Sequence, residues 1–498
     1  MNSRLQIALK AIFIVWFVIA MVLQYNVGLA DNGDFTRSIR SISQGPVGID
    51  PNWPAAGSED WTRRFNNYWL PYWKLDWNVE RPQTSAIFLW LPGAVLNYLV
   101  YSRAVLFMPF LALPSKLILL GILLLIFKWT GLNSRYTTIL LFSVGVPLIL
   151  IFTNTEHMAY FNSFYLESAS FIFLFFFIIS ILLLKHDPSA AYLLCNLVAI
   201  MLLATARPAN LYWPILAVPF VLYVWSIKKN IPVFKLALAS LILIVLLTFM
   251  SAFVTVAGSN QANPYNSLFV GVLKFSSDPQ AHLQELGMED AAPCVLSTAF
   301  TPIGVTCLTQ FQDQISYRNT GLVILREPLV LFRALGFVLD NMQDLSVDYL
   351  GKYSIDDPRS KTSPRIVISG EQQRFWSQTT EPGWLNLWAA VKFRLFPTGY
   401  ALAFTLICFL FWFLWNLKGN DIKQDLALIG LMSTVACIAD MIIAILGDGI
   451  VELVRHLFLS NLLFDIALIA FFSSVLLTII ELVRKKRSGL SIQKTIVV

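Results

Sequence analysis

Apolar runs of helical length alternate along this chain with short polar loops. A helix needs about 20 mostly apolar residues to cross a hydrocarbon core roughly 30 Å thick. By this criterion the pattern predicts about ten spans, at residues 7–30, 104–128, 137–153, 169–184, 189–205, 210–226, 234–257, 398–417, 426–447 and 457–481. The expected fold is therefore an all-α polytopic membrane protein.

Composition and charge support this prediction. With 57% hydrophobic and 13% charged residues, the chain is too apolar for a soluble enzyme of 498 residues. Lysine and arginine recur in alternate short loops and in the tail at 484–487, and loops of this kind face the cytoplasm. We therefore expect cytoplasmic termini, and basic residues that serve the lipid bilayer rather than a nucleic acid.

The first span and the absent glycosylation sites bear on location. No small-residue cleavage site follows the first span, which continues as Tyr25-Asn26-Val27, so we expect a retained helix rather than a signal peptide. No Asn-x-Ser/Thr sequon occurs, which favours a bacterial inner membrane.

Two long external segments divide the chain into three parts. Residues 1–257 are expected to form an N-terminal module of seven helices, with a first external loop at 31–103. Residues 258–397 would form a loop or small external domain between the seventh and eighth helices. Residues 398–498 would form a C-terminal module of three helices with a cytoplasmic tail.

Each external segment has distinctive residues. The first is rich in Trp and Tyr, which favour the membrane interface, and its short apolar run at 87–101 is expected to be interfacial or re-entrant. The second contains Cys294 and Cys307. These are either a disulfide, worth about 3 kcal/mol on an oxidising face, or two free thiols. Amphipathic stretches at 321–339 and 384–396 are expected along the membrane, the latter as a surface anchor.

Charged residues gather in the predicted external loops. The first group is Asp31-Asn32-Gly33-Asp34-Phe35-Thr36-Arg37, directly after the first span. A carboxylate partly shielded from water has a raised pKa and can act as a general base. Asp31 and Asp34 are therefore candidate catalytic residues, with Arg37 beside them. The alternative is an Asn-Gly turn between two solvated aspartates.

The second group covers 154–167, between the third and fourth spans. If this segment is helical, Glu156 and Glu167 lie on one face together with Tyr160 and Ser163, so that two carboxylates point in one direction. The alternative for Glu167 is a favourable acidic residue at the N-terminus of the apolar helix that follows it.

The third group covers 447–456, between the last two spans. A helix from Gly449 would bring Glu452 to His456 at i+4, with Arg455 beside them. Fixed cations at this boundary suit a phosphate, because Arg offers a planar fork and His a titratable donor. Arg207 is a further external cation. The alternative is that these arginines extend to the interface beside local counter-ions.

Three ionisable residues, Lys116, Asp440 and Asp465, lie deeper in predicted spans. Such residues mark either a functional site or hydrogen bonds between neighbouring helices. The chain contains no Walker A loop, dinucleotide-binding glycine motif or GxSxG elbow, which argues against nucleotide hydrolysis, hydride transfer and serine-hydrolase chemistry. No metal-ligand spacing occurs either, so no cofactor is expected and a divalent metal is not required.

Together these residues resemble the multispan GT-C glycosyltransferases, and more narrowly the hexosyltransferase-like membrane proteins of bacterial surface-glycan loci. The resemblance covers the transmembrane part and leaves out 258–397. It rests on the Asp31 to Arg37 motif, on Tyr160-x-Asn162-Ser163-Phe164-Tyr165-x-Glu167, and on Gly447-Asp448-Gly449-x-x-Glu452-x-x-Arg455-His456 with Asp465 downstream.

The resemblance implies an inverting transfer on the external, periplasmic face. The donor would be a polyprenyl-phosphate sugar and the acceptor a lipid-linked or polymeric glycan, as in O-antigen and other cell-envelope polysaccharide synthesis. Asp34 or Asp31 would be the general base, and Arg207, Arg455 and His456 would hold the departing phosphate. The residues that the resemblance implies in substrate positioning are Arg37, Glu156, His157, Asn162, Tyr165, Glu167, Asp448 and Glu452. Glu167 and Glu452 could alternatively orient the cations.

Two other functions fit part of the pattern. A polysaccharide polymerase or ligase also uses lipid-linked glycans, and would rely on the arginines of 258–397. A lipid-glycan transporter or flippase would carry charge across the membrane depth, whereas the polar residues here gather at one boundary, with the three deep residues as exceptions.

Overall fold

The computed structural model describes residues 3–25, 27–29, 35, 42–46, 72–77, 84–132, 135–187, 189–228, 235, 242, 261–342, 383–418 and 421–495. The catalytic candidates Asp31 and Asp34, their neighbour Arg37, and nearly all of the predicted span at 234–257 lie outside the described residues.

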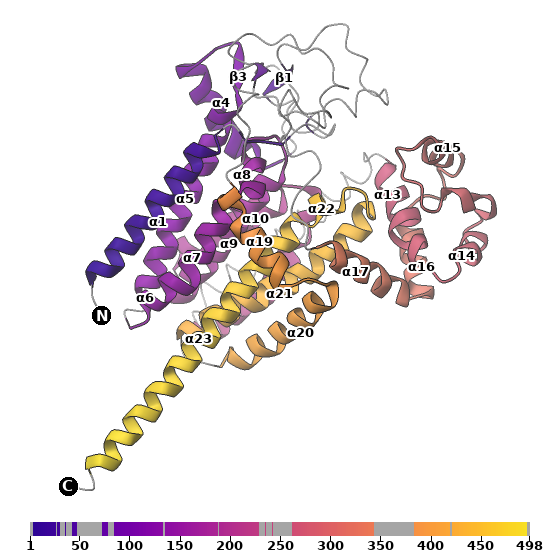
Figure 1. The fold of residues 1–498 in the computed structure, drawn as a ribbon. Helices are drawn as coiled ribbons and strands as arrows, with labels where there is room; N and C mark the ends of the chain where they lie inside the picture. Colours follow the sequence, from indigo (N-terminus) through magenta and orange to yellow (C-terminus); the bar gives the residue numbers. More distant parts are fainter. Residues whose placement is uncertain are drawn as a thin grey trace.

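Helices dominate the described structure (Figure 1). The elements before residue 230 are α1 (Ser3–Leu23), β1 (Ser43–Pro46), β2 (Tyr72–Leu75), α4 (Ile87–Val100), β3 (Val105–Phe107), α5 (Met108–Leu132), α6 (Thr137–Leu140), η1 (Leu141–Gly145), α7 (Val146–Phe152), α8 (Thr155–Phe161), α9 (Glu167–His186), α10 (Ala190–Ala204), η2 (Pro208–Asn210) and α11 (Trp213–Lys228). The later elements are α13 (Ala262–Asn266), η3 (Ser267–Val272), η4 (Leu273–Phe275), α14 (Pro279–Glu285), η5 (Glu289–Cys294), α15 (Pro302–Gln310), α16 (Tyr317–Arg326), α17 (Leu329–Asn341), η7 (Gly383–Asn386), α19 (Leu387–Leu395), α20 (Gly399–Asn416), α21 (Asp421–Asp448), α22 (Leu453–His456) and α23 (Phe458–Thr495).

Six described helices are long and apolar enough to cross a membrane: α1, α5, α9, α20, α21 and α23. A seventh span results if the segment from α6 to α8, bent by 55°, is counted as one. Helix α10 has 15 residues, which is only about 22 Å at 1.5 Å per residue. The described residues therefore form a polytopic helical bundle, and the predicted count of about ten spans is not confirmed.

Both termini lie at one end of the bundle (Figure 1). We call the opposite end the distal end. The small antiparallel sheet β1-β2-β3 and the helices from α13 to α17 both lie there. The predicted interfacial or re-entrant run at 87–101 forms α4, which packs on α5. Gly93 allows this close approach, because a Cβ atom there would lie 2.6 Å from the carbonyl oxygen of Phe110.

The segment predicted to be the first external loop contributes to the core as well as to the surface. Trp73 of β2 is buried, and its ring lies 5.7 Å from that of Phe35 and 5.3 Å from that of Phe164. Trp77 is exposed and contacts Tyr98. The expected position on the bilayer surface is therefore wrong for Trp73, whose apolar ring area is better buried against other aromatic rings.

Buried ionisable residues connect the helices of the bundle. At the end near the termini, Asp425 of α21 accepts hydrogen bonds from Trp129 of α5 and from Lys185 of α9, with His186 2.8 Å away. Deeper in the bundle, Asp440 of α21 accepts a 2.6 Å hydrogen bond from Ser460 of α23. Of the two interpretations offered for Asp440, the structure thus contains the hydrogen bond between neighbouring helices.

Asp465 has a different partner. Its carboxylate lies 2.9 Å from the Lys392 ammonium and accepts a 2.8 Å hydrogen bond from Trp388. Both partners belong to α19 and are buried. The expected surface anchor at 384–396 is therefore wrong: this stretch turns Trp388 and Lys392 into the bundle, where a buried carboxylate requires a counter-charge.

The helices from α13 to α16 have their own hydrophobic core, which includes Tyr265, Phe269, Leu283 and Val323 and is joined by Val330 at the start of α17. We call residues 261–342 the external domain, after the sequence-based expectation that this segment is external. Cys294 and Cys307 form a disulfide in it, with a Cα–Cα distance of 6.0 Å. The predicted cysteine pair is thus formed.

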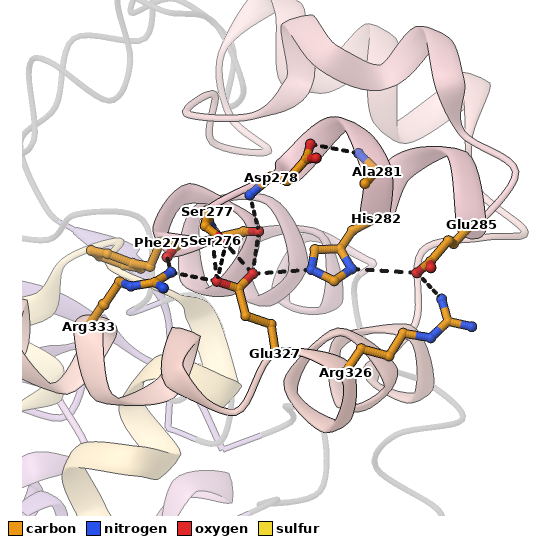
Figure 2. Close-up of polar contacts among 10 residues, drawn as sticks. All are labelled: Phe275, Ser276, Ser277, Asp278, Ala281, His282, Glu285, Arg326, Glu327 and Arg333. Carbon is orange, nitrogen blue, oxygen red and sulfur yellow. Dashed lines mark hydrogen bonds and ion pairs between the residues drawn. The ribbon is translucent and has the colours of Figure 1, made fainter.

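Helices α16 and α17 are separate, so the stretch 321–339 is not one surface helix. Figure 2 shows Glu327, at their junction, as a hydrogen-bonded hub. Its carboxylate accepts hydrogen bonds from Ser276, Ser277 and Arg333, and lies 3.2 Å from His282. Burial alone would raise the pKa of Glu327, but these hydrogen bonds together hold it well below its ordinary value.

This arrangement predicts an acid-sensitive external domain. Because the folded-state pKa of Glu327 is lowered, its stabilisation is complete above an unfolded-state pKa of about 4.5 and is lost progressively as the pH falls. Wild type should unfold at a higher temperature than Glu327→Gln at pH 7, and the difference should shrink below pH 4.5. The exposed Glu289→Gln serves as the control. A difference that is independent of pH would contradict the assignment.

Candidate functional site

The candidate site begins where the segment 154–167 is broken. Helix α8 ends at Phe161 and α9 begins at Glu167, so the expected continuous helix is wrong. Asn162 lies at the break. Its amide donates hydrogen bonds to the carbonyl oxygens of Gln24 at 3.1 Å and Val27 at 2.5 Å, and accepts one from Lys116 at 3.2 Å. This side chain connects the residues that follow α1 to the end of α8.

Two arginines converge on Glu167. Arg207 Nη1 lies 3.4 Å from Glu167 Oε1, and Arg455 Nε lies 4.0 Å from the same oxygen. The three side chains are 6–8% exposed. The guanidinium of Arg455 also lies over the Tyr165 ring at 5.3 Å and pairs with Glu452 at 2.6 Å. One buried carboxylate thus connects α9, the turn before η2, and α22.

His456 lies beside these two arginines. Its Nδ1 lies 3.2 Å from Arg207 Nη2, and its Nε2 lies 3.4 Å from Asp448 Oδ2. Because a guanidinium can only donate, Nδ1 accepts the hydrogen bond and the neutral ring carries its proton on Nε2, facing Asp448. Below we call Arg207, Arg455 and the adjacent His456 the cation cluster, after its two arginines.

The loop that carries Asp448 and Glu452 is not helical from Gly449. Gly449 has φ +63° and Glu452 has φ +46°, both in the left-handed region, and α22 begins only at Leu453. The backbone amide of His456 donates to the carbonyl oxygen of Glu452 at 3.2 Å, but the expected i+4 pairing of their side chains is wrong. In this turn Glu452 pairs with Arg455 at i+3, and His456 contacts Asp448 instead.

The first predicted motif is represented by one described residue. Phe35 follows Asp34 in the sequence and is buried, with its ring 4.7 Å from Tyr165 and 5.5 Å from Phe164. The Tyr165 ring therefore contacts Phe35 and also lies beneath Arg455. The second and third motifs meet at Glu167, and Phe35 packs beside them.

Two other predicted site residues lie outside the cation cluster. His157 is buried, with Nδ1 2.9 Å from the carbonyl oxygen of Ile151 and its ring between Phe171 and Phe458. Glu156 is buried at the start of α8, where its backbone amide donates to the side chain of Asn154.

Sequence reasoning missed Asn266, which donates a 2.7 Å hydrogen bond to Asp448. Asn266 belongs to no motif and lies far from Asp448 in the sequence, so no local pattern identifies it. Among the residues that the structure describes, no group of three or more His, Cys, Asp or Glu side chains is arranged to hold a metal ion.

The fold defines a multi-pass membrane protein. A family model described as the YfdI N-terminal transmembrane domain matches residues 2–496. The chain therefore belongs to this family. Searches of curated proteins and of solved structures found no match.

The shared carboxylate leads to a stability prediction. Glu167→Gln leaves two buried guanidiniums without their common counter-charge, and should cost about 3 kcal/mol of unfolding free energy. Glu452 is 29% exposed, so Glu452→Gln should cost about 1 kcal/mol or less. Denaturant titration in detergent micelles measures both. Equal, small losses would show that Glu167 does not hold the arginines.

Proposed function

We propose that this protein is an inverting glycosyltransferase. It would move a sugar from a polyprenyl-phosphate donor to a lipid-linked or polymeric glycan acceptor, at the distal end of the bundle and on the external face of a bacterial inner membrane. The main support is that Arg207 and Arg455, from separate elements, meet at one buried carboxylate, and that His456 contacts Arg207.

The cation cluster has the chemistry that a lipid phosphate requires. Two guanidiniums offer paired N–H donors that match phosphate oxygens. Glu167 attracts both guanidiniums from 3.4 and 4.0 Å, which helps to keep them in place where negative charge develops on the leaving oxygen. Glu452 is more exposed than Glu167 and Asp448, the other acids beside the cation cluster. In this mechanism the ion pair between Glu452 and Arg455 opens, and Arg455 binds the incoming phosphate.

The base would come from the first motif. Asp34 or Asp31 takes the proton of an acceptor hydroxyl while its oxygen attacks the anomeric carbon. The bond from that carbon to the phosphate oxygen breaks on the opposite side, which inverts the configuration. The departing polyprenyl phosphate keeps the bonding electrons and stays with the arginines. The packing of Phe35 on Tyr165 supports a base near the cation cluster.

Contacts elsewhere in the chain favour this proposal over its alternatives. A polymerase or ligase would use arginines of the external segment, but Arg326 pairs with Glu285 and Arg333 with Glu327 inside the external domain. A transporter would need charge available across the membrane depth.

The deep ionisable residues have partners within the protein. Lys392 pairs with Asp465, and Lys116 donates a hydrogen bond to Asn162. Asp440 bonds to Ser460. Hydrogen bonds between neighbouring helices are a usual part of helix packing in membranes, and these contacts engage all three residues within the protein.

The general-base assignment predicts that Asp34→Asn or Asp31→Asn lowers sugar transfer by at least about 100-fold without changing the amount of folded protein. Purified protein would be incubated with radiolabelled polyprenyl-phosphate hexoses and a membrane glycolipid extract. Asp76→Asn, in the same external loop, is the matched control and should remain active.

Two results would contradict different parts of the proposal. Full activity in both Asp34→Asn and Asp31→Asn would exclude these aspartates as the base. A wild-type protein that transfers none of the labelled hexoses would count against the glycosyltransferase function itself.

A further inference from the structure

Asn266 lies where the external domain meets the loop between α21 and α22. It is fully buried at the end of α13. Its Nδ2 donates a 2.7 Å hydrogen bond to Asp448 Oδ1, and its Oδ1 accepts a 2.8 Å hydrogen bond from the Ala299 amide. Both ends of this amide are therefore used, one toward each structural unit.

Asp448 connects Asn266 to the cation cluster. One carboxylate oxygen is held by Asn266, and the other lies 3.4 Å from His456 Nε2. The opposite ring nitrogen of His456 contacts Arg207. A continuous series of polar contacts therefore runs from the external domain through Asp448 and His456 to Arg207.

The backbones also meet closely at this junction. A Cβ atom on Gly449 would lie 2.5 Å from the carbonyl oxygen of Asn266, and one on Gly271 would lie 2.8 Å from that of Ile445. Tyr317 donates a further hydrogen bond to the carbonyl oxygen of Gly447 at 3.1 Å. Burial, with the nearby Asp448 charge, raises the pKa of Tyr317 to about 12, so this donor stays protonated at neutral pH.

The disulfide lies directly behind Asn266. Ala299, whose amide holds the Asn266 oxygen, belongs to the loop closed by Cys294 and Cys307. Tyr265, the neighbour of Asn266, donates a 3.3 Å hydrogen bond to the carbonyl oxygen of Cys294. The disulfide-closed loop therefore supports Asn266 from the side opposite to Asp448.

We propose that Asn266 is a positioning residue: by holding Asp448 it keeps His456 in the Nε2–H form beside Arg207, so that the external domain sets the geometry of the cation cluster. The consequence for sugar transfer rests on the proposed function. The effect of Asn266 on the His456 ring does not rest on the proposed function.

The sharpest test exchanges the donor and the acceptor of the hydrogen bond between Asn266 and Asp448. In Asn266→Asp, the carboxylate still accepts from Ala299 but repels Asp448, so the bond is lost. Adding Asp448→Asn restores it in reverse, because the new amide donates to position 266 while its oxygen accepts from His456. Asn319→Ala, which removes a hydrogen bond to Gln314 elsewhere in the external domain, is the matched control.

Two measurements report the outcome. Donor kcat/KM should fall about tenfold in Asn266→Asp, the value of one charge-assisted hydrogen bond, and recover to within about threefold in the exchanged double variant. The KM for the acceptor should stay unchanged. Diethyl pyrocarbonate labelling of His456, read by mass spectrometry, should rise in Asn266→Asp and return in the double variant, while His186 labelling stays constant.

Each result supports or overturns the proposal. Unchanged His456 labelling in Asn266→Asp, or a double variant no better than the single one, would overturn it. If Asn266→Asp does not fold, Asn266→Ser removes the same bond without adding charge and must give the same rise in labelling. If wild type transfers no sugar, the labelling still tests Asn266, and only the proposed function fails.

Discussion

The arrangement at the distal end depends on the contact of one buried carboxylate, Glu167, with two guanidiniums. Unpaired charges of this kind are costly at a membrane boundary, and pairing makes the site possible. Because Arg207 and Arg455 come from different elements, their shared partner also determines how α9, the turn before η2 and α22 meet. Among the described ion pairs, replacing Glu167 would remove the carboxylate partner of Arg207, whereas Arg455 would keep Glu452.

The same principle recurs through the bundle at other depths. Asp425 connects α5, α9 and α21, and Asp465 draws α19 into the bundle through Lys392 and Trp388. Apolar side chains pack almost equally well against lipid and against other helices, so helix packing in a membrane gains specificity from such polar contacts. The ties are strong because the surrounding medium offers no competing water.

The class of fold was predictable from the sequence, because long apolar runs have a single interpretation in a chain of this composition. The number of spans was not, since helices such as α10 are too short for the criterion and the segment from α6 to α8 is bent. Glu167, Arg455 and Arg207 were expected in loops at one membrane face, but their contacts with one another come from the structure.

The local geometry of the site was not predictable, because it depends on backbone angles and distant partners. The positive φ values at Gly449 and Glu452 redirect His456 toward Asp448 and Arg207. The burial of α19 depends on Asp465, which lies far away in the sequence. Asn266 acts across the boundary of the external domain. Periodicity describes one element at a time and contains no information on such contacts.

The central claim is that the cation cluster binds a lipid phosphate, and a binding measurement tests it most directly. Purified protein in micelles would be titrated with a polyprenyl phosphate and with the uncharged polyprenol of the same chain length, followed by native mass spectrometry. Wild type should prefer the phosphate by at least about tenfold. Arg207→Gln and Arg455→Gln should each reduce that preference, and the exposed Arg103→Gln should keep it. Equal binding of both lipids by wild type would contradict the account.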